Sequence, residues 1–139
     1  MRKDLLLLAI EAILKYPESF HYGVFVGPGW CGAPLSCNTL ACVAGRATTV
    51  PEIAARGLFI DPGTGKVQLK RANGFVELDP ATAIASVFEL NTGEALYLFF
   101  PYRRSLPASG LRHSPGWNAT AQEVAAHFHR FIAWKEQQK

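Results

Sequence analysis

Two thiols within a short run of small residues are the groups in this sequence best suited to chemistry. Cys37 is followed by Asn38, which tolerates a left-handed backbone, and by Thr39, a residue type that caps helices. We therefore expect a helix that begins near Leu40, with Cys37 at or just before its N-terminus. Unpaired N–H groups at a helix N-terminus favour a thiolate, so Cys37 is the candidate nucleophile and His21 is a candidate base for it.

The residues that follow favour a structural interpretation of the same segment. Cys42 stands among Ala, Val and Gly, as a small core residue does. Ala44, Gly45 and Ala47 carry almost no side chain, so their helix can approach a neighbouring element closely. We expect a buried central helix with Cys42 in the core, and nothing in the sequence pairs a histidine with either thiol.

The cysteines and His21 together offer four potential metal ligands. Cys31, Cys37 and Cys42 are spaced as Cys-x5-Cys-x4-Cys, whereas compact zinc sites use pairs of cysteines separated by about two to four residues. We therefore expect no metal site, and no motif in the chain points to a cofactor.

A long basic loop late in the sequence is the best candidate for partner binding. Residues 102–118 contain no Asp or Glu. Long loops in compact domains are often functional, and arginine together with aromatic residues suits an anionic ligand or a protein partner. We expect this loop to bind another protein or an anionic ligand, with the aromatic segment before Cys37 as a further candidate. The candidate binding residues are Arg103, Arg104, Arg112, Trp117 and Trp30.

The elements that position these residues are mostly helical. Hydrophobic periodicity, capping residues and proline stops predict about five helices. Asn91 with Glu94, and Thr120 with Glu123, have the spacing of capping boxes. The five longer helices are predicted at residues 4–16, 40–49, a segment that opens at 79–80, 91–99 and 120–134, and a short helix is predicted at 51–57.

One region of the sequence is β-forming. Residues 58–60 and 66–70 are apolar or alternating runs separated by Asp-Pro-Gly-Thr-Gly, a strong turn signal. Ala-Asn-Gly at 72–74 then turns the chain into a third run at 75–78. We predict a mainly helical α+β fold with a small antiparallel β-hairpin or three-stranded meander around residues 58–78.

Composition limits the remaining possibilities. A chain of 139 residues with 49% hydrophobic content has enough apolar material for one core, so residues 1–139 are expected to form a single domain. The net charge of +3 does not favour a nucleic-acid partner. Three cysteines, an odd number, fit a reducing cytoplasm, and no apolar stretch is long enough to cross a membrane.

The cysteine motif resembles that of a family of small bacterial and phage proteins that carry Cys-Gly-Thr-x-x-Cys-(Ile/Val/Leu)-Ala-Gly-x-Ala. From Cys37 to Ala47 this chain reads Cys-Asn-Thr-Leu-Ala-Cys-Val-Ala-Gly-Arg-Ala, so Asn38 replaces the usual Gly. Asn and Gly both accept a positive φ, which keeps the turn chemistry. Leu-Phe-Phe-Pro at 98–101 is similar to the family's Leu-Phe-x-Pro. The resemblance implies a phage or mobile-element setting, and it carries over no catalytic residue.

These observations favour a cytoplasmic interaction or regulatory module of phage or mobile-element type over an enzyme. The motifs that stand out explain packing, and none of them assembles an acid, a base and a nucleophile. The alternative is a cysteine-dependent enzyme that uses Cys37 at a helix N-terminus. The oligomeric state is not specified by any feature of the sequence.

Overall fold

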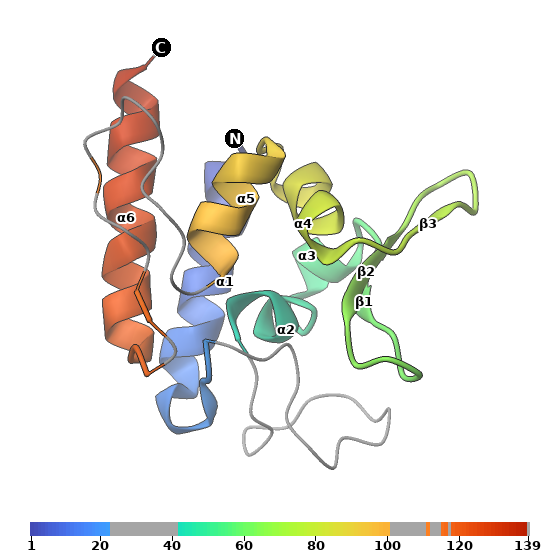
Figure 1. Cartoon of the computed structure of the whole chain (residues 1–139), viewed down its shortest axis with the longest axis horizontal. Coiled ribbons are helices and arrows are strands. Elements are labelled where there is room, and N and C mark those ends of the chain that lie inside the picture. The colour runs from blue at the N-terminus through green and yellow to red at the C-terminus, as the bar shows by residue number, and fades with distance from the viewer. Residues whose placement is uncertain (23–41, 101–110, 112–114, 117, 139) are drawn as a thin grey trace.

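The computed structural model describes residues 1–22, 42–100, 111, 115–116 and 118–138. Helices dominate it, and one small sheet lies at the side of the molecule (Figure 1). The predicted mainly helical α+β fold is confirmed, and the β region is the three-stranded meander. The elements are α1 Lys3–Lys15, the 3₁₀ turn η1 Pro17–Ser19, α2 Val43–Ala47, α3 Pro51–Ala54, β1 Leu58–Ile60, β2 Val67–Lys70, β3 Val76–Glu77, α4 Pro80–Phe88, α5 Thr92–Phe99 and α6 Ala121–Gln137.

Helices α1 and α2 form the centre of the molecule. Every residue of α2 is buried, including the small Ala44, Gly45 and Ala47, and the helix packs against α1. The predicted buried central helix is therefore confirmed. It begins later than expected, because Cys42 precedes it in an extended conformation and Val43 is its first residue. Cys37 lies outside the described residues, so its role as a nucleophile stays a prediction.

The sheet is antiparallel with the strand order β1-β2-β3. Leu58 of β1 is paired with Leu69 of β2, and Ile60 with Val67, and all four side chains are buried. Because side chains alternate along a strand, these residues share the face that packs on α4. The other edge strand, β3, continues the hairpin away from the helices (Figure 1).

Local capping signals set the helix starts in the second half of the chain. The Asp79 carboxylate accepts a hydrogen bond from the Thr82 N–H at the start of α4. Both predicted capping boxes are present, one formed by Asn91 with Glu94 at α5 and one by Thr120 with Glu123 at α6. Each box satisfies two N–H groups that a helix start would otherwise leave unpaired.

Side chains from elsewhere complete the C-terminal end of α5. A helical carbonyl normally accepts from the N–H four residues later, but the residue four positions after Tyr97 is Pro101, which has no N–H. The Tyr97 carbonyl lies 2.9 Å from Nε2 of His127 on α6, which donates to it. The Tyr22 hydroxyl donates to the Leu98 carbonyl. These bonds tie α5 to α6 and to the segment after η1.

The opposite end of the α5–α6 pair is held by charge. Glu94, only 3% exposed, receives a hydrogen bond at 2.5 Å from the Lys135 ammonium near the end of α6. Residues from the helices and from the first two strands join in one hydrophobic cluster. Among the described residues, no helix combines the length and apolar character that a membrane crossing requires.

Candidate functional site

Most of the residues expected from the sequence to act in binding or catalysis lie outside the described residues. This holds for the candidate nucleophile and for all five candidate binding residues, whose roles stay predictions. They are Cys37, Trp30, Arg103, Arg104, Arg112 and Trp117.

His21, the candidate base, is the exception. It is partly exposed and lies just after η1, between Phe20 and the buried Tyr22. The rings of these two neighbours stack with centroids 6.1 Å apart. The described structure thus places His21 in a packed aromatic turn, while its pairing with Cys37 stays a prediction.

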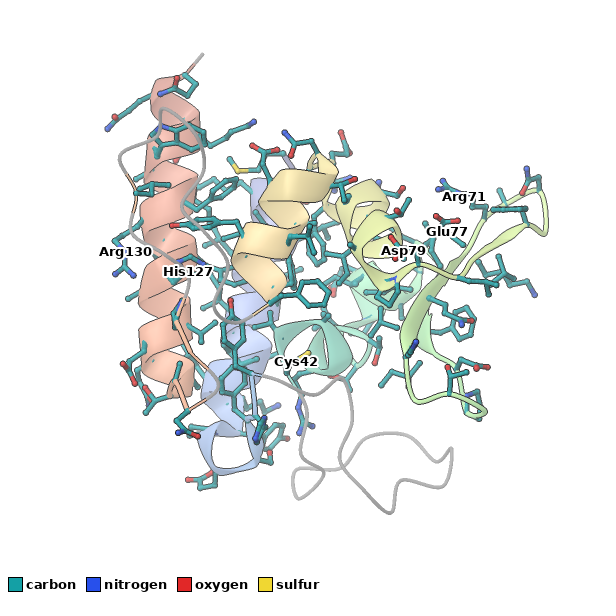
Figure 2. All side chains as sticks on the ribbon, viewed as in Figure 1. Cys42, Arg71, Glu77, Asp79, His127 and Arg130 are labelled. Atoms are coloured by element: carbon teal, nitrogen blue, oxygen red, sulfur yellow. The ribbon has the colours of Figure 1, made fainter. Side chains whose placement is uncertain are left out.

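Cys42 is a core residue, as the sequence predicted. It is 2% exposed, and its sulfur lies inside the molecule at the start of α2 (Figure 2). Burial raises the pKa of the Cys42 thiol to about 11, so the thiol is neutral near pH 7 and a poor nucleophile. Within the part of the chain that the structure describes, no three His, Cys, Asp or Glu side chains gather to hold a metal ion.

Two buried charged side chains, Arg46 and Glu94, are used for folding. The Arg46 guanidinium, on α2, donates to the Ser19 hydroxyl at 3.1 Å and lies over the Tyr16 ring at 5.5 Å. Glu94 caps α5 and binds Lys135. Groups of this kind anchor segments to one another and are not open to a ligand.

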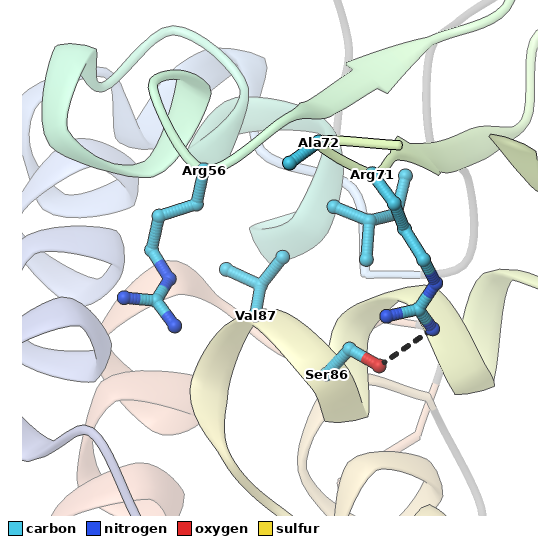
Figure 3. A pocket seen from close by; sticks show the side chains of 6 residues that line it. Arg56, Arg71, Ala72, Ser86 and Val87 are labelled. Carbon is cyan, nitrogen blue, oxygen red and sulfur yellow. Dashed lines mark hydrogen bonds between the residues drawn. The ribbon is translucent and has the colours of Figure 1, made fainter. Parts of the chain in front are cut away.

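The described surface does contain a shallow pocket between the sheet and α4, which we call the arginine pocket. Its volume is about 220 Å³. Figure 3 shows the side chains of Arg56 and Arg71 reaching toward α4, with Val87 between them. The lining residues are Arg56, Leu69, Arg71, Ala72, Ser86 and Val87.

The side chains that line the arginine pocket include two cations and no carboxylate. Arg71 donates to the Ser86 hydroxyl at 3.2 Å, so its hydrogen-bond partner is a neutral group. Arg56 faces the Glu89 carboxylate at 3.6 Å, but the same carboxylate lies 3.7 Å from Arg2. Arg2 is itself bonded to the Asp4 carboxylate at 2.7 Å, so the Glu89 carboxylate is available to balance Arg56. The side chains that line the pocket nevertheless include two guanidinium groups and no carboxylate, which suits an anion.

A close backbone contact holds the pocket together. Gly57 has a φ of +99°, which L side chains rarely adopt, and an added Cβ would overlap the Lys70 carbonyl oxygen. The Gly57 carbonyl accepts a hydrogen bond from the Lys70 N–H at 2.9 Å. This pairing sets the start of β1 opposite the end of β2, and it brings Arg56 and Arg71 to one pocket.

Sequence reasoning missed both arginines. Arg56 was part of a predicted helix end, and Arg71 lay between two predicted strands. The sequence did contain a signal for this pairing. The first two predicted strands form an antiparallel hairpin, which places Arg56, before the first strand, near Arg71, after the second strand.

The hairpin beside the pocket carries exposed apolar side chains. Phe75 is 57% exposed and Leu78 is 64% exposed, and they flank β3. Phe75 accepts a hydrogen bond through its carbonyl from the Arg71 N–H at 2.8 Å, so these two residues are direct cross-strand neighbours. Successive side chains alternate, so Phe75 shares a face with Arg71, and Leu78 lies on the other face with Val76.

The outer edge of β3 is open in the described part of the chain. Hydrogen-bonded pairs alternate along an antiparallel ladder, and Arg71 with Phe75 is such a pair. The N–H and C=O of Val76 and the N–H of Leu78 therefore point away from β2, and β3 has no further strand beside it in the described sheet. We define the hairpin surface as Phe75, Val76, Leu78 and the flanking Lys70 and Arg71.

Comparisons with known proteins give no similarity to set beside this geometry: no family model, no curated protein and no solved structure matches the chain.

Proposed function

We propose that this protein is an interaction module that binds an extended segment of a partner protein on its hairpin surface. The observation that carries the proposal is the pair of large apolar side chains, Phe75 and Leu78, each more than half exposed at the ends of an open edge strand. Exposed apolar side chains of this size next to an open edge mark sites of association.

The form of the edge indicates how the partner would bind. Val76 and Leu78 direct backbone groups outward at an edge with no further strand beside it in the described sheet, and an extended peptide satisfies such groups by adding a strand. The strand β3 is only two residues long, so backbone bonds alone give a short ladder, and side chains must supply the rest of the affinity.

The charges beside the edge indicate the chemistry of the partner. Lys70 is the cross-strand neighbour of Val76, and Arg71 is the neighbour of Phe75, so each face of the hairpin presents one cation next to an apolar side chain. A segment that alternates apolar and acidic residues complements both faces. This choice of an anionic protein partner agrees with the partner class expected from the sequence.

Other expectations from the sequence enter the proposal without a structural test. The loop 102–118 is proposed as a further contact for the same partner. The cytoplasmic location and the phage or mobile-element setting stay predictions, and so does the alternative of an enzyme that uses Cys37.

The test is capture of partners from the host by immobilised protein, with matched variants. Phe75→Thr/Leu78→Thr removes the apolar side chains and keeps strand propensity. Leu7→Gln/Leu14→Gln removes two other exposed leucines, which lie on α1 away from the sheet, and keeps helix propensity. We expect the hairpin variant to lose the captured protein and the α1 variant to retain it.

Two results would contradict the proposal. One is a hairpin variant that is as stable as the wild type and captures the same protein to the same extent. Alternatively, both variants lose the captured protein equally, which indicates nonspecific adhesion to exposed apolar groups.

A further inference from the structure

From the geometry of the arginine pocket we infer that it is a binding site for a phosphate monoester. Two guanidinium groups from separate elements, Arg56 before β1 and Arg71 after β2, line one pocket with the Ser86 hydroxyl of α4 (Figure 3). This site uses none of the apolar side chains on which the hairpin proposal depends, and Arg71 is the one residue that the two proposals share.

The contacts of both guanidinium groups leave them able to bind a ligand. Arg71 is bonded to a neutral hydroxyl, and Arg56 lies 3.6 Å from the half-exposed Glu89 carboxylate, a surface ion pair of the kind that contributes little to stability. The other acidic neighbour is Glu77, which is paired across the sheet with Leu69 and shares its face. Among the described residues, no carboxylate lies within ion-pair distance of Arg71.

The donors suit a tetrahedral dianion better than a carboxylate. A guanidinium presents a planar fork of N–H groups that matches the oxygen atoms of phosphate. The Ser86 hydroxyl accepts from Arg71, which leaves its own hydrogen available for a third oxygen. A phosphate monoester carries nearly two negative charges at pH 7 and three acceptor oxygens, so it can use all three groups at once.

The shape of the pocket limits the remainder of the ligand. The apolar lining residues Leu69 and Val87 are buried, so they form a floor and offer little surface for an apolar body. A volume of about 220 Å³ holds the phosphate and the atoms next to it. The site therefore recognises the phosphate end of a ligand whose remainder lies outside, either a phosphorylated side chain or a phosphorylated small molecule.

The experiment is an NMR titration of the full chain at constant ionic strength with three probes. These are inorganic phosphate, the peptide Gly-Gly-phosphoserine-Gly-Gly, and the same peptide with Glu in place of phosphoserine. We expect the backbone amide signals of Arg71, Ala72 and Ser86 to show saturable chemical-shift changes with the first two probes. The Glu peptide should bind more weakly. Tighter binding of the phosphopeptide than of phosphate assigns the site to a protein side chain, and equal binding assigns it to a small molecule.

Variants separate a specific site from general surface charge. Arg56→Ala and Arg71→Ala should each weaken phosphate binding about tenfold or more, since each removes charge-assisted hydrogen bonds. Arg71→Lys keeps the positive charge but loses the planar set of N–H donors. Its phosphate affinity should lie between that of Arg71→Ala and that of the wild type. Arg130→Ala, at an exposed arginine on α6, should leave phosphate binding unchanged. Glu89→Gln should tighten binding, a change that a purely structural role would not produce.

Three results would overturn the inference. One is binding of the Glu peptide as tight as that of the phosphopeptide. Another is unchanged phosphate binding by folded Arg71→Ala protein. The third is a set of shifts that spread over many basic residues without saturation, which would indicate an adventitious ion only.

Discussion

The α5–α6 pair and the hairpin side of the molecule use polar groups in opposite ways. Between α5 and α6, polar groups such as Glu94 and Nε2 of His127 are buried and bonded to groups of the protein. On the hairpin side, Arg56 and Arg71 are exposed, and the outward-facing backbone groups of Val76 and Leu78 have no further strand beside them in the described sheet.

The comparison separates polar groups that hold the fold from polar groups left for a ligand. A buried group costs free energy when its partner is removed, because it cannot turn to water. Removal of the neighbour of an exposed group changes the free energy of unfolding little, because water can replace the lost partner. Substitutions between α5 and α6 should therefore change stability, and substitutions on the hairpin surface should change binding.

The largest effect is expected where the hairpin joins the fold. Gly57→Ala places a side chain at a φ of +99° and against the Lys70 carbonyl oxygen, so β1 must separate from β2. We expect the free energy of unfolding to fall by about 3 kcal/mol or more, measured by urea denaturation.

Gly74 at the hairpin turn is the matched control. Its φ is +87°, but an added Cβ meets no atom within 4 Å. Gly74→Ala should cost only the backbone strain, about 1 kcal/mol. Equal losses for the two variants would show that the Gly57 contact does not fix the position of the pocket.

The second effect concerns pH and the α5–α6 pair. The pKa of His127 is lowered to about 4, mainly by burial and in smaller part by the Arg130 charge, against the opposing effect of the hydrogen bond to the Tyr97 carbonyl. As the pH falls, His127 is protonated in the unfolded chain before it is protonated in the folded protein. His127 therefore makes the free energy of unfolding decrease between about pH 6.5 and about pH 4, with no further decrease below that range. The expected loss is about 3 kcal/mol over that range.

His127→Gln provides the control for this pH dependence. The amide of glutamine can donate to the Tyr97 carbonyl and does not titrate. Urea denaturation at a series of pH values should give a flatter profile for the variant than for the wild type. Identical profiles would contradict the assignment of a buried neutral imidazole.

The third effect compares two lysine–glutamate ion pairs. Lys135 binds Glu94, whose side chain is buried, whereas Lys3 binds Glu136 at 3.1 Å on the surface. Lys135→Ala leaves a buried carboxylate with only its capping bond, and it should cost about 2 kcal/mol. Lys3→Ala should cost less than about 1 kcal/mol. A thermal melt in which the two variants lose equal stability would remove the distinction between the buried and the exposed pair.

Features set by neighbouring residues could be predicted from the sequence. Asn91 and Glu94, like Thr120 and Glu123, form capping boxes through contacts that span only three positions. The burial of Cys42 followed from its small apolar neighbours. The start of α2 was placed too early, because the capping potential of Thr39 did not determine the backbone at Cys42, which is extended.

Features set by tertiary contacts could not be predicted in the same way. The proline at position 101 indicates that α5 ends with unpaired carbonyls, but the crossing of α5 and α6 decides that His127 reaches one of them. In the same way, the register that sets Gly57 opposite Lys70 decides that Arg56 and Arg71 share a pocket. Neither relation is visible until distant segments are placed together.

Hydrogen exchange at Val76 and Leu78, measured by NMR on the free chain and on the chain bound to its captured partner, tests the central claim most directly. If the edge of β3 is open for a partner strand, both amides should exchange in the free protein at close to the rate of an unstructured chain, and binding should slow them at least about tenfold. Protection of these amides in the free protein, or their continued fast exchange in the complex, would contradict the account.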